Sequence, residues 1–162
     1  MEHLILLAQA LLVAGLAGWL GIGAFENIRV PRANADMVAD VIAMRVIRAE
    51  SPELFRLVGG NRIESPLFHR FAFAAIVIAE SLSVILMTAG SLGLLGALAG
   101  FWAVEPAKII AAAGVLGFTM VWSGFLVGGQ WFHYFLGHQE AQHTHFMLAI
   151  WGVVVFGIVV GF

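Results

Sequence analysis

The sequence predicts an all-α polytopic membrane protein with four transmembrane helices and a cytoplasmic amphipathic helical segment. The 162 residues are 61% hydrophobic and only 11% charged, and their mean hydropathy is +0.96. A soluble domain of this size needs far more charge to cover its surface. A bilayer-spanning helix takes about 20 apolar residues. Such runs recur along one expected membrane domain, residues 1–162, at about 4–25, 67–95, 107–128 and 146–162.

The first apolar run, residues 4–25, has the composition of a helix that packs against other helices. Gln9 is its one strongly polar interior residue, and alanine and glycine recur along it. Small residues let helix backbones approach closely where no water drives apolar association. The run lacks the Lys or Arg that opens a signal peptide and exceeds the length of a signal-peptide core. We therefore expect a retained spanning helix.

The longest polar stretch, residues 26–65, sets the expected topology. Every arginine lies between Glu26 and Arg70, and Lys108 is the only lysine. Cytoplasmic loops of membrane proteins carry an excess of Lys and Arg. We therefore expect the Arg-rich segment 26–70 to be cytoplasmic and both termini to lie on the opposite side.

Two kinds of helix signal occur within and after this polar stretch. Residues 34–49 place apolar side chains at helical spacing with charges between them, which is typical of a helix lying at a membrane surface. Ser51-Pro52 and Ser65-Pro66 each combine an N-cap residue with proline at the first helical position. They predict the starts of a short helix and of the second span.

Glu80 is the only charge in the apolar centre of the second span. Burying a carboxylate at membrane depth is costly, so such residues face other helices or a polar cavity and mark candidate functional sites. No Lys, Arg or His lies within the apolar centre of a span, so we expect a neutral carboxyl group. It is either a proton-accepting or ligand-orienting group, or a structural tie between helices. The candidate hydrogen-bonding partners in the other spans and on its own helix are Gln9, Ser83, Thr119 and Ser123.

A group of histidines follows the third span. His138, His143 and His145 lie close to Glu140, and imidazole with carboxylate is suitable chemistry for zinc, copper or iron. On a helix, however, His138 and His145 share a face that His143 does not, unlike the paired histidines of metalloprotease helices. These four residues are a candidate metal site, and interfacial histidines without a metal are the alternative.

Haem or a pigment is another candidate cofactor. His69 begins the second span, and His133 and His145 flank the connection between the third and fourth spans. All three fall on the same expected side of the membrane. Bis-histidine ligation requires two of them to face each other across the bundle, and no histidine lies at mid-membrane.

The order of several polar and aromatic residues resembles a bacterial family of predicted small integral membrane proteins, defined by domain of unknown function 2165. It includes Asn27, Asn34, Pro66 and Glu80, and its most specific part is Gly128-Gly129-Gln130-Trp131-Phe132. The resemblance covers almost the whole chain. It implies four helices in the bacterial inner membrane, with periplasmic termini in the topology above, and no established activity. The family usually has a glutamate where this chain has Gln130.

The sequence favours no enzymatic activity. It contains no cysteine, hydrolytic triad, P-loop or dinucleotide fingerprint. A net charge of -2 provides no basic field for nucleic acid. Our leading hypothesis is a non-catalytic accessory or assembly subunit, without a cofactor, of a larger respiratory or photosynthetic membrane complex, or else a homo-oligomer. Three GxxxG pairs that could join membrane helices motivate it, namely Gly96/Gly100, Gly124/Gly128 and Gly157/Gly161.

Two alternatives belong to other classes. One is a transporter or sensor for a small solute, protons or a metal, using Glu80 and the cytoplasmic histidines. The other is a haem- or pigment-binding electron-transfer subunit. All three hypotheses place the protein in a lipid bilayer, and they differ in what it binds there.

Overall fold

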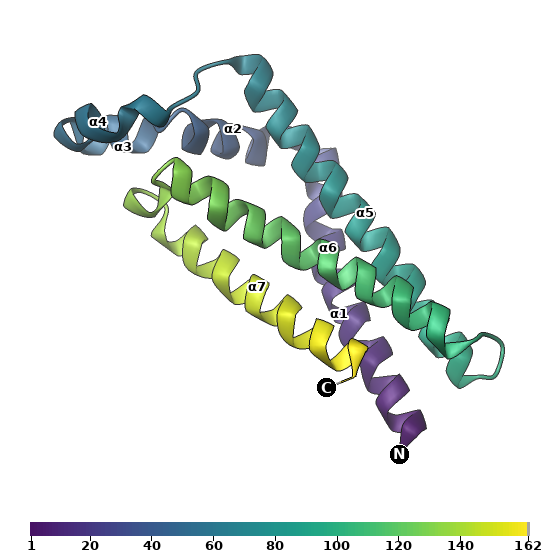
Figure 1. The fold of residues 1–162 in the computed structure, drawn as a ribbon. Coiled ribbons are helices and arrows are strands. Elements are labelled where there is room, and N and C mark those ends of the chain that lie inside the picture. The colour runs from purple at the N-terminus through teal and green to yellow at the C-terminus, as the bar shows by residue number, and fades with distance from the viewer. Residues whose placement is uncertain (162) are drawn as a thin grey trace.

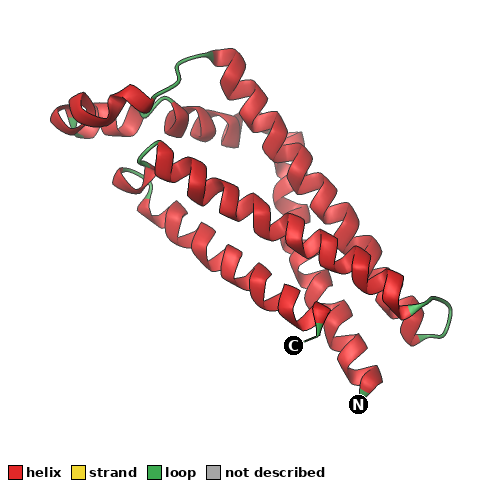
Figure 2. Ribbon diagram, in the orientation of Figure 1, coloured by secondary structure: helices red, strands yellow, loops and turns green. Residues whose placement is uncertain are grey.

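The computed structural model describes residues 1–161, which are helical almost throughout and include no strand (Figure 1, Figure 2). The helices that are long and apolar enough to span a membrane are α1 (Glu2–Arg29), α5 (Pro66–Leu98), α6 (Val104–Trp131) and α7 (Gln139–Val160). The segments between them contain α2 (Pro31–Ile42), α3 (Arg45–Glu50), α4 (Pro52–Val58) and the 3-10 helices η1 (Gly59–Asn61) and η2 (Tyr134–Leu136). The predicted all-α fold class with four candidate membrane-spanning helices is confirmed.

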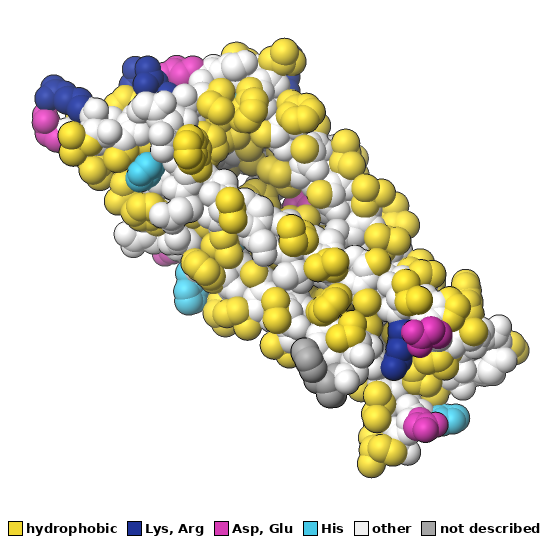
Figure 3. All heavy atoms as spheres, in the orientation of Figure 1, with side chains coloured by type: hydrophobic (Ala, Val, Ile, Leu, Met, Phe, Trp, Pro, Cys, Tyr) yellow, Lys and Arg dark blue, Asp and Glu magenta, His cyan; other side chains and the backbone are white. Residues whose placement is uncertain are grey.

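The four long helices form a bundle in which α5 and α6 run antiparallel, with α1 beside α5 and α7 beside α6 (Figure 1). The N-terminus, the end of α7 and the α5–α6 connection lie at one end of the bundle. Helices α2, α3 and α4 lie at the other end. Figure 3 shows charged side chains gathered toward the two ends, with hydrophobic side chains covering the face between them. This distribution suits helices that cross a bilayer.

Small residues bring the backbones of α5 and α6 into close contact. A side chain at Gly90 would collide with the backbone of Ala111, and one at Gly114 would collide with the backbone of Met87. Small residues permit this approach, and the packing of the two backbones stabilises the pair. The contact lies in the half of the bundle that is away from α2 (Figure 1).

Two buried polar side chains join the spans within the same half. The Gln9 amide donates a hydrogen bond to the carbonyl of Ile158 over 2.8 Å, which ties α1 to α7. The Ser91 hydroxyl donates to the carbonyl of Ala10 over 2.9 Å, which ties α5 to α1. Polar side chains in a membrane protein gain about 0.6–2 kcal/mol from such contacts. They help to fix the register of α1 against its neighbours.

The amphipathic segment departs from its prediction at Ala43 and Met44, which separate α2 from α3. The helix predicted over residues 34–49 is interrupted at Met44, whose φ of 53° is left-handed. That conformation is costly for a residue with a side chain, and burial of the Met44 side chain, which is 1% exposed, offsets the cost. The predicted starts at Pro52 and Pro66 are confirmed, and the Ser65 hydroxyl caps the second of these helices.

The last long helix begins earlier than predicted. Its apolar run was expected from residue 146, but α7 begins at Gln139 because no helix breaker separates the polar residues from the apolar ones. His138 is its N-cap residue and follows Gly137. Part of the expected histidine segment therefore belongs to this helix. Phe162, the last residue of the predicted span, lies outside the described residues.

Candidate functional site

A cavity of about 620 Å³ lies in the half of the bundle nearest α2. It lies on the side where α5 and α6 diverge from their close contact at Gly90 and Gly114 (Figure 1). Residues 72–80 of α5 and residues 120–129 near the end of α6 supply much of its lining, and α1, α2, the turn after α6, η2 and α7 supply the rest. The volume is within the range of about 300–1,000 Å³ that is usual for small-molecule sites.

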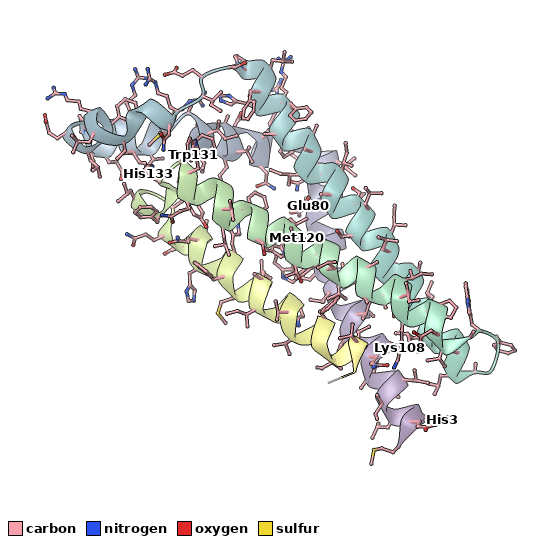
Figure 4. All side chains as sticks on the ribbon, in the orientation of Figure 1. His3, Glu80, Lys108, Met120, Trp131 and His133 are labelled. Atoms are coloured by element: carbon pink, nitrogen blue, oxygen red, sulfur yellow. The ribbon has the colours of Figure 1, made fainter. Side chains whose placement is uncertain are left out.

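The cavity opens sideways between α5 and α6. Figure 3 shows a hollow between these helices with acidic atoms at its floor, and Figure 4 labels Glu80 at that position. Met120 on α6 lines the cavity and is 61% exposed, so it lies at the rim of the opening. Because α5 and α6 are both candidate spans, the opening lies at the level of the apolar helix surfaces. A molecule dissolved in the bilayer could therefore enter it.

Helix α2 covers the end of the cavity that points along the bundle toward the polar segment. Met37, Val38 and Val41 on its apolar face line the cavity. The segment between α2 and α5 is held in place by hydrogen bonds from its main chain and side chains. The N–H of Ile63 donates to the carbonyl of Ile42, and the Asn61 amide donates to the carbonyl of Trp131 over 2.9 Å. This cover makes the lateral opening the more accessible route into the cavity.

A chain of hydrogen bonds ends on Glu80. The Asn34 side-chain amide donates to Oδ1 of Asn27 over 2.6 Å, and the Asn27 amide donates to Oε2 of Glu80 over 2.8 Å. Glu80 is 5% exposed and lines the cavity, and within residues 1–161 its other oxygen, Oε1, has no hydrogen-bonding partner. One carboxyl oxygen is thus satisfied by the protein, and the other remains for a molecule in the cavity.

The partners expected for Glu80 from the sequence are not the ones that bind it. The Gln9 amide donates to α7, and the hydroxyls of Ser83 and Thr119 each donate to the carbonyl four residues earlier on their own helix. Ser123 makes no hydrogen bond to Glu80 among the described residues. A hydroxyl within a helix satisfies itself locally more readily than it reaches a neighbouring helix.

Asn27 is the partner that sequence reasoning missed. It lies in the last turn of α1, which continues to Arg29, whereas the first span was expected to end at residue 25. Asn27 therefore faces the bundle and not a polar loop. Both Asn27 and Asn34 belong to the residue order that carries the family resemblance, and that was the available signal for their role.

The wall of the cavity that faces α7 is a set of nearly parallel rings. His145 stacks on Phe125 with centroids 4.7 Å apart, and Trp122 and Tyr134 lie 5.5 and 6.1 Å from the His145 ring. Nε1 of Trp122, the Tyr134 hydroxyl and Nδ1 of His145 are buried without a hydrogen-bonding partner among the described residues. Leaving a buried donor unpaired costs about 1–3 kcal/mol. Burial also raises the pKa of the Tyr134 phenol.

The expected metal cluster is not gathered in one place. Residues 1–161 contain no group of three His, Cys, Asp or Glu side chains that could hold a metal ion. Glu140 and His143 are exposed on α7. His138 lines the cavity at the start of that helix, and His145 belongs to the ring wall.

The candidate haem ligands occupy three different settings. Nε2 of His69 lies 2.7 Å from the carbonyl oxygen of Ile63 and joins the start of α5 to the preceding loop. His133 adopts a left-handed conformation, with φ of 55°, in the turn after α6. His145 is stacked in the ring wall. Haem binding stays a prediction.

The segment that carries the family resemblance forms the α2 end of the cavity. Gly128, Gly129 and Phe132 line the cavity, and Gly129 packs directly against the ring of Tyr134. Trp131 is exposed and accepts a hydrogen bond from Asn61 through its carbonyl. Gln130 is also exposed, and Figure 4 shows Trp131 and His133 at this end of α6.

The family model for predicted small integral membrane proteins, DUF2165, matches residues 5–161. The chain belongs to this family. The match includes most of α1, all of α5 and α6, and the complete cavity lining, so the cavity lies within the part of the chain that defines a DUF2165 protein. No curated protein and no solved structure gives a significant match.

Proposed function

We propose that this DUF2165 protein binds a lipid-soluble molecule that enters the cavity from the bilayer, with Glu80 as its polar anchor. One observation supports the proposal above all others. A cavity of about 620 Å³ opens between two candidate spans, and the carboxyl group of Glu80 lies at its floor. A carboxyl group at membrane depth is costly to keep, and only one oxygen of Glu80 is hydrogen bonded within the described residues. A bound molecule that forms a hydrogen bond with the carboxyl group offsets that cost.

The proposal favours the part of the transporter or sensor hypothesis that depends on Glu80. Binding is a step common to both of those functions. The cover formed by α2 and the lateral opening favour a ligand from the membrane over one from water. The metal version of the hypothesis receives no such support, because the histidines and Glu140 are not gathered.

The test is to identify what the protein retains when it is isolated gently. Gly124 lines the cavity, is exposed, and a Cβ there would meet no other atom within 4 Å, so Gly124→Leu places a side chain at the open side of the cavity without a collision at Cβ. Gly18 on α1 is equally unobstructed and does not line the cavity, so Gly18→Leu is the matched control. Native mass spectrometry and solvent extraction then measure the bound small molecules.

We expect the wild-type protein and Gly18→Leu to retain the same hydrophobic molecule and Gly124→Leu to lose it. An unchanged set of bound molecules in Gly124→Leu would contradict the proposal. The mass of the intact assembly and its visible absorption, recorded in the same samples, test the accessory-subunit and haem hypotheses.

The accessory-subunit hypothesis stays a prediction. Several of the glycines that motivated it have structural roles within this chain itself. Gly124 and Gly128 line the cavity, Gly157 is buried, and Gly161 caps α7 with a left-handed φ of 99°. Support for a partner must therefore come from the mass of the assembly and not from these motifs.

We infer a bacterial inner-membrane location with the Arg-rich segment 26–70 in the cytoplasm and both termini in the periplasm. The chain has no cysteine, so single cysteines can report sidedness. An impermeant maleimide added to intact cells should label His3→Cys, and it should label Arg56→Cys only after lysis. The reverse pattern would contradict this orientation.

A further inference from the structure

We infer that the cavity selects a hydrophobic organic cation, meaning an apolar body that carries one positively charged centre. The inference rests on the proposed function and adds the class of ligand. It starts from the charges around the cavity. Glu80 is the only carboxyl side chain among the described residues that line it, and neither Lys nor Arg lines it. The other titratable lining side chains are Tyr134, His138 and His145.

The hydrogen bonds around Glu80 leave room for a cation. Asn27 donates to Oε2, and Oε1 has no partner within the described residues. The amide of Asn27 is neutral, so it does not supply the counter-charge that a buried carboxylate needs. A positive centre in the cavity supplies that charge and lies next to the free oxygen. A cation can thus take the place of the proton that keeps an isolated carboxyl group neutral.

Aromatic rings surround the same space. Rings attract cations through their electron-rich faces, most strongly where water is excluded. The rings that line the cavity come from α1, α5, α6 and the turn after α6. Three of them stack with the His145 ring, and the others belong to α1, α5 and the turn. They belong to Trp19, Phe73, Trp122, Phe125, Phe132 and Tyr134.

The carboxyl group acts against an anion, because a carboxylate repels it. The apolar side chains that line the cavity disfavour small hydrated cations, because these lose their hydration without gaining enough ligands. A cation with an apolar body loses little free energy on desolvation and fills the cavity. The expected order of affinity is hydrophobic cation above neutral analogue above hydrophobic anion.

Tetraphenylphosphonium and tetraphenylborate test this order directly, because they have nearly the same shape and opposite charge. Their binding to the purified full chain is measured by equilibrium dialysis in a neutral detergent, with protein-free micelles as the blank. The variants are Glu80→Gln, which keeps an acceptor for Asn27, Glu80→Asp, which keeps the charge, and the pair Gly124→Leu and Gly18→Leu.

We expect the cation to bind the wild-type protein and Gly18→Leu, and Glu80→Gln to weaken that binding at least about tenfold. Glu80→Asp should retain part of the affinity. Gly124→Leu should abolish it, and the borate should bind more weakly than the cation throughout. Circular dichroism and elution volume confirm that each variant is folded.

Two results overturn the inference in distinguishable ways. If the probes bind, Gly124→Leu abolishes their binding and Glu80→Gln has no effect on the preference for the cation, the class of ligand is wrong while the proposed function stands. If no hydrophobic probe of either charge shows binding that Gly124→Leu reduces, the proposed function fails together with the inference.

Discussion

Asn27 is the residue on which the arrangement of Glu80 depends. Its amide group joins Asn34 on α2 to Glu80 on α5, so it connects three helices through hydrogen bonds of 2.6 and 2.8 Å. The sequence identified Glu80 because a lone charge in an apolar run is conspicuous. It did not identify Asn27, because an asparagine near the expected end of a span is equally compatible with a loop.

Replacing Asn27 should destabilise the bundle. Asn27→Ala removes one partner from Asn34 and one from Glu80, and a buried polar group left unpaired costs about 1–3 kcal/mol. Unfolding in mixed micelles with increasing SDS measures the free energy. Asn34→Ala should cost less on its own, and the double variant should cost less than the sum of the single ones. Strictly additive losses would show that the three side chains do not form one network.

Tyr134 gives a spectroscopic test of the ring wall. It is the only tyrosine, so tyrosinate absorbance in an alkaline titration reports on it alone. Burial raises the pKa of its phenol above the ordinary value of 10.0, so we expect a midpoint above 10.0 in the folded protein and near 10.0 after unfolding. A folded midpoint at or below 10.0 would show that the phenol is exposed.

The sign of the effect on stability follows from the same pKa. Above pH 10.0 the unfolded chain ionises Tyr134 first and binds fewer protons than the folded chain, so the free energy of unfolding falls as the pH rises. Tyr134→Phe should remove this part of the alkaline loss. As a control, the circular dichroism of the wild-type protein is recorded over the same pH range to measure its helix content.

Helices α5 and α6 determine whether a cavity exists. They are in close contact at Gly90 and Gly114, and neither glycine belongs to a GxxxG pair of the sequence. The spans themselves could be predicted from hydropathy, and their starts from Ser-Pro pairs. The interruption at Met44 and the place where α5 and α6 diverge could not, because both depend on contacts between distant parts of the chain.

Adding a side chain at the close contact between α5 and α6 should destabilise the protein. A methyl group at Gly90 meets the backbone of Ala111, which cannot move without shifting α6. We expect Gly90→Ala to lower the free energy of unfolding by about 1–3 kcal/mol, as overpacking does in other cores. Gly18→Ala, where nothing lies within 4 Å, should cause no loss. Equal effects of the two variants would contradict the close packing of α5 and α6.

The molecule as a whole combines a closed half with an open half. In the closed half, α5 and α6 are in close contact and α1 is tied to α5 and α7. In the open half the cavity lies under α2 and between diverging spans. Such a division suits the proposed entry of a molecule from the bilayer, since the closed half holds the spans together while the other half leaves an entrance. Hydropathy alone predicts four spans and not this difference between the halves.

Quenching of Trp122 by brominated lipid tests the lateral entrance most directly. Trp122 lines the cavity and is only 7% exposed, so lipid chains outside the bundle have little contact with it. A version with the other four tryptophans replaced by phenylalanine leaves Trp122 as the only emitter. In bilayers with brominated acyl chains, we predict strong quenching that Gly124→Leu largely removes and Gly18→Leu preserves. Weak quenching, or quenching that Gly124→Leu leaves unchanged, would contradict a cavity that opens to the membrane.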